Sequence, residues 1–157
     1  SQTRRYAGIM DALSEANVPV SNVRQIDYYT VFGSPVPSTS SYKSYEELFF
    51  PVDYTAVIGF NDLQSYSAME ILKERGYRIP EDISLISFDH LRKTHTYLPP
   101  LTSIADNTDK SIADTAVSIL LDKIKNSDSK FTGAVLPVTI YDGHTTGPVN
   151  KAFETSF

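Results

Sequence analysis

The sequence predicts an α/β protein of three layers, in which helices cover both faces of a mostly parallel, twisted sheet. Two short apolar runs, residues 55–60 and 83–88, have the length of buried strands and carry no charge. Residues 61–75 between them read as a helix, because Asn61 stands in a cap position, Gln64 follows three residues later and a glycine lies just past the end. Strand, helix and strand of these lengths form a βαβ unit, so we expect the two strands to be parallel neighbours.

A polar residue follows each of these strands, Asn61 after the first and Asp89 after the second. Parallel strands end at the same edge of a sheet, and open α/β sheets bind ligands at their carboxyl edge. Each residue also has a structural explanation: a cap such as Asn61 stabilises a helix by about 1 kcal/mol, and Asp89 suits a turn. A carboxylate directly after an apolar strand is costly unless it is exposed or paired, so Asp89 is the sharper site candidate.

The helix at residues 61–75 is apolar on more than one side, although a helix lying on a sheet needs only one apolar stripe. The second stripe is therefore expected to meet another helix or another subunit. The two faces consist of Ala68, Ile71 and Leu72, and of Leu63, Tyr66 and Met69.

The rest of the chain reads as further helices and strands with one long loop. The last strand contains Pro137, which indicates an edge position, and the residues from Asp142 onward look like turn and tail. In chain order we expect a helix at 3–17, a strand at 23–29, a loop rich in Ser and Pro at 30–44, a short helix at 42–50, a strand at 101–104, a helix at 106–125 and a strand at 134–141.

Composition excludes several classes of function. The 157 residues suffice for one domain with a sizeable core, and the net charge of −5 argues against a nucleic-acid interface in this chain. There is no Gly-rich phosphate loop, no nucleophile elbow and no cysteine. The histidines lack metal-ligand spacing; His90 beside Asp89 could bind a metal, but a structural or solvated pair is the commoner outcome. We therefore expect no enzyme activity, no metal and no cofactor.

Several segments together resemble the LacI/GalR family of bacterial transcription regulators. They are RYAG at 5–8, TAVIGFND at 55–62, LKERGYRIPEDISLISFD at 72–89 and YLPPLT at 97–102. The resemblance covers the later part of that family's effector-binding domain, which has a periplasmic-binding-protein-like type I fold; the DNA-binding headpiece, the hinge and the first half of the sensor have no counterpart. It assigns residues 1–100 and 134–157 to the carboxyl-terminal subdomain and residues 101–126 to the amino-terminal one, across the ligand cleft.

The resemblance also implies a ligand site. Arg5 matches the family position at which an arginine fork holds sugar hydroxyls or carboxylates, whereas the neighbouring Arg4 reads as a solvated charge. Asn61 and Asp89 would hydrogen-bond the ligand, and Arg5 could pair with Asp89 when the site is empty. An aromatic ring that stacks on the effector would come from Phe32, from Tyr42 or from neither.

The implied function is effector sensing. The ligand would be a small hydroxylated molecule, most simply a sugar, and His90 in place of a second acid leaves its identity open. Tyr66 and Tyr97 are expected at a homodimer interface, against ordinary packing within the chain. Operator DNA would be bound only through the missing headpiece, in the bacterial cytoplasm and without membrane contact. The alternatives are a sugar-binding protein of a transport system, which shares the architecture, and a sugar-processing enzyme.

Overall fold

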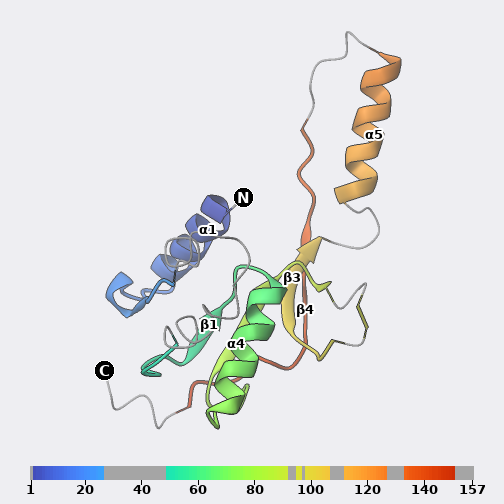
Figure 1. Cartoon of the computed structure of the whole chain (residues 1–157). Coiled ribbons are helices and arrows are strands. Elements are labelled where there is room, and N and C mark those ends of the chain that lie inside the picture. Colours follow the sequence, from blue (N-terminus) through green and yellow to red (C-terminus); the bar gives the residue numbers. More distant parts are fainter. Residues whose placement is uncertain are drawn as a thin grey trace.

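The computed structural model describes residues 2–26, 49–91, 95–96, 98–106, 112–126 and 133–150. Its centre is a four-stranded sheet with the order β1-β2-β3-β4 (Figure 1). The first two pairings are parallel and the last is antiparallel, which confirms the predicted parallel βαβ unit and the edge position of the final strand. The strands are β1 (Ala56–Ile58), β2 (Ser84–Phe88), β3 (Thr102–Asp106) and β4 (Val138–Tyr141).

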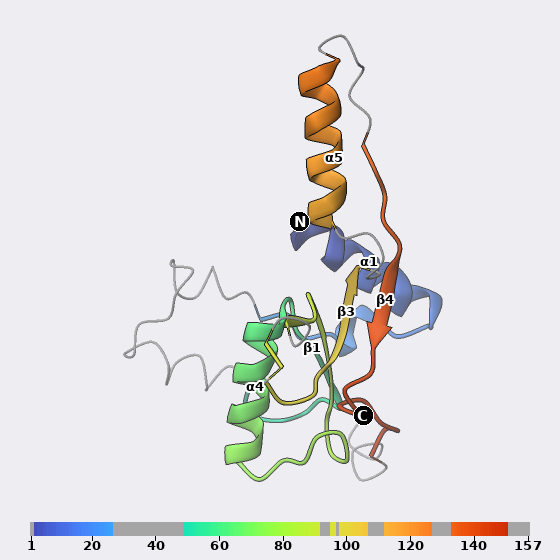
Figure 2. The ribbon, with the colours of Figure 1, turned by 90° about the vertical axis from the view of Figure 1, so that its right-hand side faces the viewer.

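Helices lie on both faces of the central strand β2, as predicted. α4 (Asp62–Glu74) covers one face, because Leu85 packs with α4 side chains and the Ser65 hydroxyl donates to the Ser87 hydroxyl at 2.7 Å. Successive strand residues point to opposite faces, so Phe88 faces the other way. There it meets α1 (Gln2–Glu15), whose Arg5 guanidinium lies 4.8 Å from the Phe88 ring centre. Figures 1 and 2 show the two helices on either side of the sheet.

Both apolar stripes of α4 are buried within the chain except at Leu63. Ala68 and Ile71 form a cluster with Phe49, while Tyr66 and Met69 pack with Leu85, Leu101 and the partly buried Leu98. Within the chain, Tyr66 and Met69 pack against extended backbone rather than against another helix, and contact of this stripe with another subunit stays a prediction. The extended segment that leads into β3 covers them, and Leu63 on the same side stays 66% exposed.

The two parts of segment 101–126, which was predicted to lie across the ligand cleft, take different places in the structure. β3 belongs to the main sheet, where Ile86, Ser87 and Phe88 pair with Thr102, Ser103 and Ile104. α5 (Ile112–Lys125) instead stands away from the sheet beside the chain that leads into β4 (Figures 1 and 2). Much of its apolar side is exposed, including Leu120 and Ile124 at 58% and 70%. The division into two subdomains stays a prediction.

Residues 143–147, which were expected to be part of a turn and tail, form hydrogen bonds with the sheet. β2 pairs with β3 only from Ile86 onward, and the preceding residue Leu85 pairs with Thr145 instead. The Leu85 N–H donates to the Thr145 carbonyl and the Thr145 hydroxyl donates to the Leu85 carbonyl, both at 2.7 Å. The Thr102 N–H also donates to the Thr145 hydroxyl at 2.9 Å. This stretch closes the amino-terminal ends of β2 and β3, a role that the sequence did not indicate.

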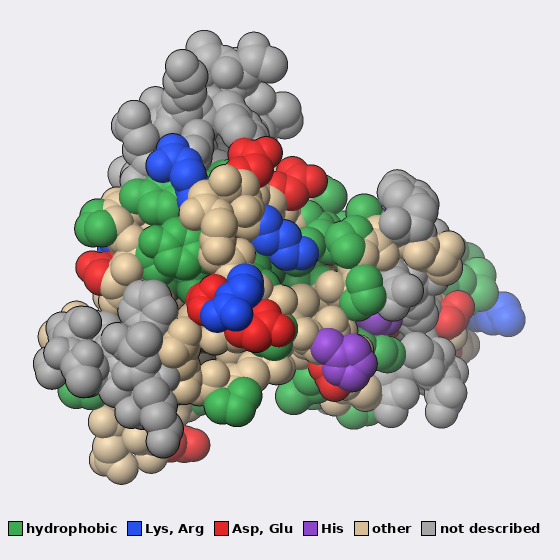
Figure 3. Space-filling view, turned by 90° about the horizontal axis from the view of Figure 1, so that it is seen from below, with side chains coloured by type: hydrophobic (Ala, Val, Ile, Leu, Met, Phe, Trp, Pro, Cys, Tyr) green, Lys and Arg blue, Asp and Glu red, His purple; other side chains and the backbone are tan. Residues whose placement is uncertain are grey.

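Other expectations find a partial counterpart. The predicted strand at 23–29 is absent over residues 23–26, which follow a short 3-10 helix at Val20–Asn22, and its remainder lies outside the described residues. The loop at 30–44 and most of the short helix at 42–50 also lie outside them. None of the helices in the described part of the chain is long and apolar enough to cross a membrane. The face viewed in Figure 3 carries basic and acidic side chains side by side rather than a patch of one sign.

Candidate functional site

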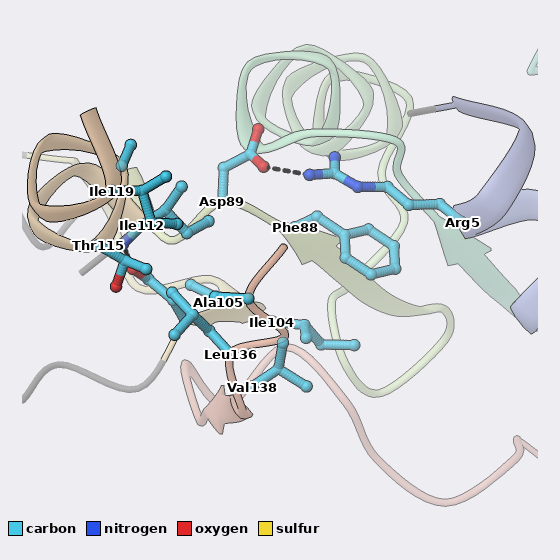
Figure 4. A pocket seen from close by; sticks show the side chains of 13 residues that line it. Arg5, Phe88, Asp89, Ile104, Ala105, Ile112, Thr115, Ile119, Leu136 and Val138 are labelled. Atoms are coloured by element: carbon cyan, nitrogen blue, oxygen red, sulfur yellow. Dashed lines mark hydrogen bonds and ion pairs between the residues drawn. The ribbon is translucent and has the colours of Figure 1, made fainter. Parts of the chain in front are cut away.

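The carboxyl edge of β1 and β2 holds an ion pair between residues far apart in the sequence. Arg5 comes from the first turns of α1 and Asp89 directly follows β2, and an Arg5 Nη2–H donates to Asp89 Oδ1 at 2.7 Å (Figure 4). The two side chains are 32% and 42% exposed. The pairing proposed from the resemblance is therefore present, and solvent reaches both groups.

The Arg5 guanidinium is held in one orientation by three further contacts. It donates through Nη1 to the Phe60 carbonyl at 2.7 Å. Its central carbon lies 5.0 Å from the Phe60 ring centre and 4.8 Å from the Phe88 ring centre, within the range of cation–π attraction. A planar guanidinium that two rings and two acceptors hold loses little further freedom when it binds a ligand. The site therefore presents a preorganised fork of donors.

Asn61 lies at the same edge and serves as the cap of α4. Its backbone is extended, with φ −152° and ψ 167°, and its side-chain oxygen accepts from the Gln64 N–H at 2.9 Å. The structural explanation for Asn61 is thus confirmed. Its side-chain NH₂ group keeps donors for a ligand, so the contact role stays a prediction.

The turn after β2 has an unusual backbone. Asp89 and His90 have φ values of +96° and +49°, and consecutive left-handed residues other than glycine cost about 1–2 kcal/mol each. The His90 ring stacks on Tyr141 with centroids 3.9 Å apart and planes 9° apart. Asp89 is therefore the acid that this turn presents beside Arg5, while the imidazole packs over β4.

A cavity of about 530 Å³ opens beside the ion pair. Figure 4 shows Arg5 and Asp89 at one side of it and the first turns of α5 at the other. Ile104 and Ala105 of β3 form part of its wall. The space next to the two charges is thus bounded partly by apolar groups.

Of the remaining predicted site residues, the structure describes only Tyr66. Phe32, Tyr42 and Tyr97 lie outside the described residues. Tyr66 is 9% exposed, and its hydroxyl donates to the Pro99 carbonyl at 3.0 Å, so it packs within the chain, which is the alternative that the sequence left open. Its place in a homodimer interface stays a prediction.

Two features of the site were not predicted. The rings of Phe60 and Phe88 flank Arg5, although each phenylalanine reads in the sequence as strand core. Asp62 is only 1% exposed and reaches the turn after β2. A charged residue in the first turn of a helix next to a ligand-binding edge was the signal available for Asp62. Among the described residues no cluster of three or more potential metal ligands occurs.

The mostly parallel sheet, its flanking helices and the polar groups at its carboxyl edge define an α/β protein of ligand-binding architecture. A family model described as a periplasmic binding protein-like domain matches residues 1–146. The chain belongs to this family, and it corresponds to part of the effector-binding domain of LacI/GalR-type regulators.

Known relatives agree with this assignment. The chain is 37% identical over 123 residues to the HTH-type transcriptional repressor PurR of Aliivibrio salmonicida, a match that covers 78% of this chain and 35% of the repressor. A LacI family regulator from Enterococcus faecium with bound ribose is 25% identical with a TM-score of 0.70, over 95% of this chain and 53% of that one. CcpA of Lactococcus lactis is 25% identical with a TM-score of 0.64, over 92% and 51%. The chain thus spans about a third of the length of its curated relatives and about half that of the solved structures.

Proposed function

We propose that this chain is the effector-sensing part of a LacI/GalR-type bacterial transcriptional regulator and that it binds a sugar or a similar hydroxylated molecule at Arg5, Asn61 and Asp89. The observation that carries the proposal is the exposed Arg5–Asp89 pair at the carboxyl edge of the sheet. A regulator from Enterococcus faecium with the same fold carries bound ribose, which supports the ligand class.

The chemistry of the pair suits a polyhydroxylated ligand. A carboxylate offers about four acceptor positions, and Arg5 occupies one of them on Oδ1. A guanidinium has five N–H donors, of which Arg5 uses one on Asp89 and one on Phe60. Adjacent hydroxyls both donate and accept, so they can bind the carboxylate and the fork together through charge-assisted hydrogen bonds. Asn61 adds side-chain donors at the same edge.

In the intact regulator, the ligand would shift the population between states that differ in DNA affinity, and the size of that shift is set by the difference in ligand affinity between the two states. The proposal also includes a homodimer through α4 and the segment around Tyr97, and a cytoplasmic protein that is not an enzyme. Within this chain Leu63 offers the most exposed apolar side chain of α4. Sedimentation velocity on Leu63→Lys tests the interface, since a dimer held by α4 should dissociate in that variant.

Calorimetric titration against a panel of sugars tests the ligand site, both with this chain and with the intact gene product. Asp89→Ala and Arg5→Ala should each weaken binding by about 10- to 100-fold, because each removes a charge-assisted hydrogen bond. Matched controls exist away from the edge: Arg24 lies 4.9 Å from the Tyr54 ring centre and pairs with Asp53 at 3.2 Å. Arg24→Ala and Asp53→Ala should bind normally. Unchanged binding in both site variants would refute the assigned site.

The encoding gene distinguishes the proposal from its alternative. A helix-turn-helix in the same gene product supports the regulator. A secretory signal at its start would instead support a sugar-binding protein of a transport system, which could use the same edge of the same fold.

A further inference from the structure

The buried carboxylate of Asp62 binds the turn that carries Asp89. Asp62 is 1% exposed, and each of its oxygens accepts a short hydrogen bond: Oδ2 from the Leu91 N–H at 2.6 Å and Oδ1 from the Ser103 hydroxyl at 2.7 Å. Ser103 is fully buried in β3. Asp62 therefore connects the first turn of α4 to both β3 and the turn after β2.

Three consecutive N–H groups of this turn are bound in sequence. The Asp89 N–H donates to the Ile104 carbonyl at 2.9 Å, the His90 N–H to the Ser103 hydroxyl at 2.9 Å, and the Leu91 N–H to Asp62. Ser103 accepts from His90 and donates to Asp62, so its hydroxyl has one orientation in this chain of bonds. These contacts specify a backbone that would otherwise relax, because Asp89 and His90 are both left-handed.

We propose that Asp62, acting through Ser103 and the Leu91 N–H, is a positioning residue that sets the direction of the Asp89 carboxylate toward Arg5 and the ligand. Asp62 itself is buried and would not touch the ligand. The proposal deepens the proposed function and rests on it only for the consequence in ligand binding. The hydrogen bonds that join Asp62, Ser103 and the Leu91 N–H, here called the relay, do not depend on any ligand. It gives the adjacent residues Asn61 and Asp62 separate roles, the first in capping α4 and the second in holding the turn.

Asp62→Asn is the informative change, because it keeps the shape of the side chain. An amide has one acceptor oxygen and one donor group, so it cannot accept from both Leu91 and Ser103 through separate oxygens as the carboxylate does. One contact of the relay must weaken or reverse, and the turn should loosen around Asp89. Ser103→Ala removes the middle of the relay with a smaller change and serves as the second variant.

The matched control is Asp82→Asn. Asp82 also accepts from a backbone N–H, that of Arg78 at 2.8 Å, and from the Arg78 guanidinium at 2.7 and 2.9 Å, but these contacts lie in the loop between α4 and β2, at the opposite end of β2 from the turn. The substitution Asp82→Asn therefore disturbs a similar hydrogen-bond network and leaves the contacts of Asp62 and Ser103 unchanged.

The test is NMR on the ¹⁵N-labelled chain without ligand, with amide exchange at residues 89–91 and the guanidinium signals of Arg5 as readouts. Asp62→Asn and Ser103→Ala should speed exchange at the turn by about tenfold relative to the Leu85 amide and should average the Arg5 guanidinium signals, whereas Asp82→Asn should leave both as in the wild type. Wild-type exchange and wild-type Arg5 signals in Asp62→Asn would overturn the proposal. So would a uniform loss of protection that includes Leu85, since that indicates a general structural role. Because no sugar is needed, a failure of sugar binding in the calorimetric experiment would count against the proposed function alone.

Discussion

Substitution of Gly143 by alanine should destabilise the fold far more than its single methyl group suggests. A Cβ at Gly143 would lie 2.2 Å from the carbonyl carbon, 2.3 Å from the nitrogen and 2.6 Å from the Cα of Leu101. These are backbone atoms of the residue just before β3, so no side-chain rotation can relieve the contact. The stretch at 143–147 must move away from the sheet in the variant.

The cost follows from the contacts that this movement breaks. Overpacking of a well-filled site costs about 1–3 kcal/mol. The Gly143 N–H donates to the Thr102 hydroxyl at 3.1 Å and Thr145 bonds to both Leu85 and Thr102, and each of these buried bonds contributes about 1 kcal/mol. Together these terms give about 4–6 kcal/mol, and even the lower figure of about 4 kcal/mol is a large part of the roughly 5–15 kcal/mol that stabilises a domain.

Urea unfolding followed by far-UV circular dichroism measures this loss. With a slope of about 2 kcal/mol per molar urea, the midpoint of Gly143→Ala should fall by about 2 M. The control is Gly8→Ala in α1, where nothing lies within 4 Å of the new Cβ; alanine should there stabilise the helix by about 1 kcal/mol. The error of such a comparison of urea midpoints is about 0.5 M. If the midpoint of Gly143→Ala lies within that error of the wild-type midpoint, the closure of β2 and β3 by residues 143–147 does not stabilise the sheet.

Three further changes test the scaffold. Leu72→Ala removes a fully buried side chain from α4 and should cost about 2–5 kcal/mol of unfolding free energy in the same urea assay. Hydrogen bonds from Arg78 hold the pKa of Asp82 well below its usual range, so the stability that this pair contributes is present above the usual carboxyl range and is lost as the pH falls; Asp82→Asn should flatten the acid limb of a stability profile. Burial raises the pKa of Tyr54 from 10.0 to about 12. The stability that the protonated side chain contributes is therefore complete below pH 10 and is lost as the pH rises toward 12. Tyr54→Phe should remove that alkaline loss, as urea midpoints from pH 9 to pH 12 would show to within about 0.2 M.

The βαβ unit could be predicted because its signals are local. Strand length, a cap residue and a glycine past the helix end each depend on a few neighbouring residues, and the parallel pairing follows from the connection. The meeting of Arg5 and Asp89 needed more than local signals, since it joins the first helix to a strand end more than eighty residues later; the resemblance suggested it and the topology allows it.

The surroundings of the pair could not be predicted, because they depend on which face each side chain takes. Phe88 reads as strand core, and only the placement of α1 on that face turns its ring into a partner for Arg5. Asp62 reads as an ordinary acid in the first turn of a helix, where the macrodipole favours it. Its burial arises only because Ser103 and the Leu91 N–H, from two other segments, meet it there.

The arrangement separates affinity from stability at the ligand edge. The Arg5–Asp89 pair is partly exposed, and exposed ion pairs contribute only about 0–1 kcal/mol to folding, so evolution can change the residues that face the ligand at little cost to the fold. The groups that orient them, Asp62 and Ser103, are buried, and the loss of either leaves a polar partner unsatisfied. Substitutions at Asp89 should therefore alter binding with the fold intact. Substitutions at Asp62 should weaken binding and loosen the turn locally, because this residue directs the carboxylate through Ser103 and the Leu91 N–H.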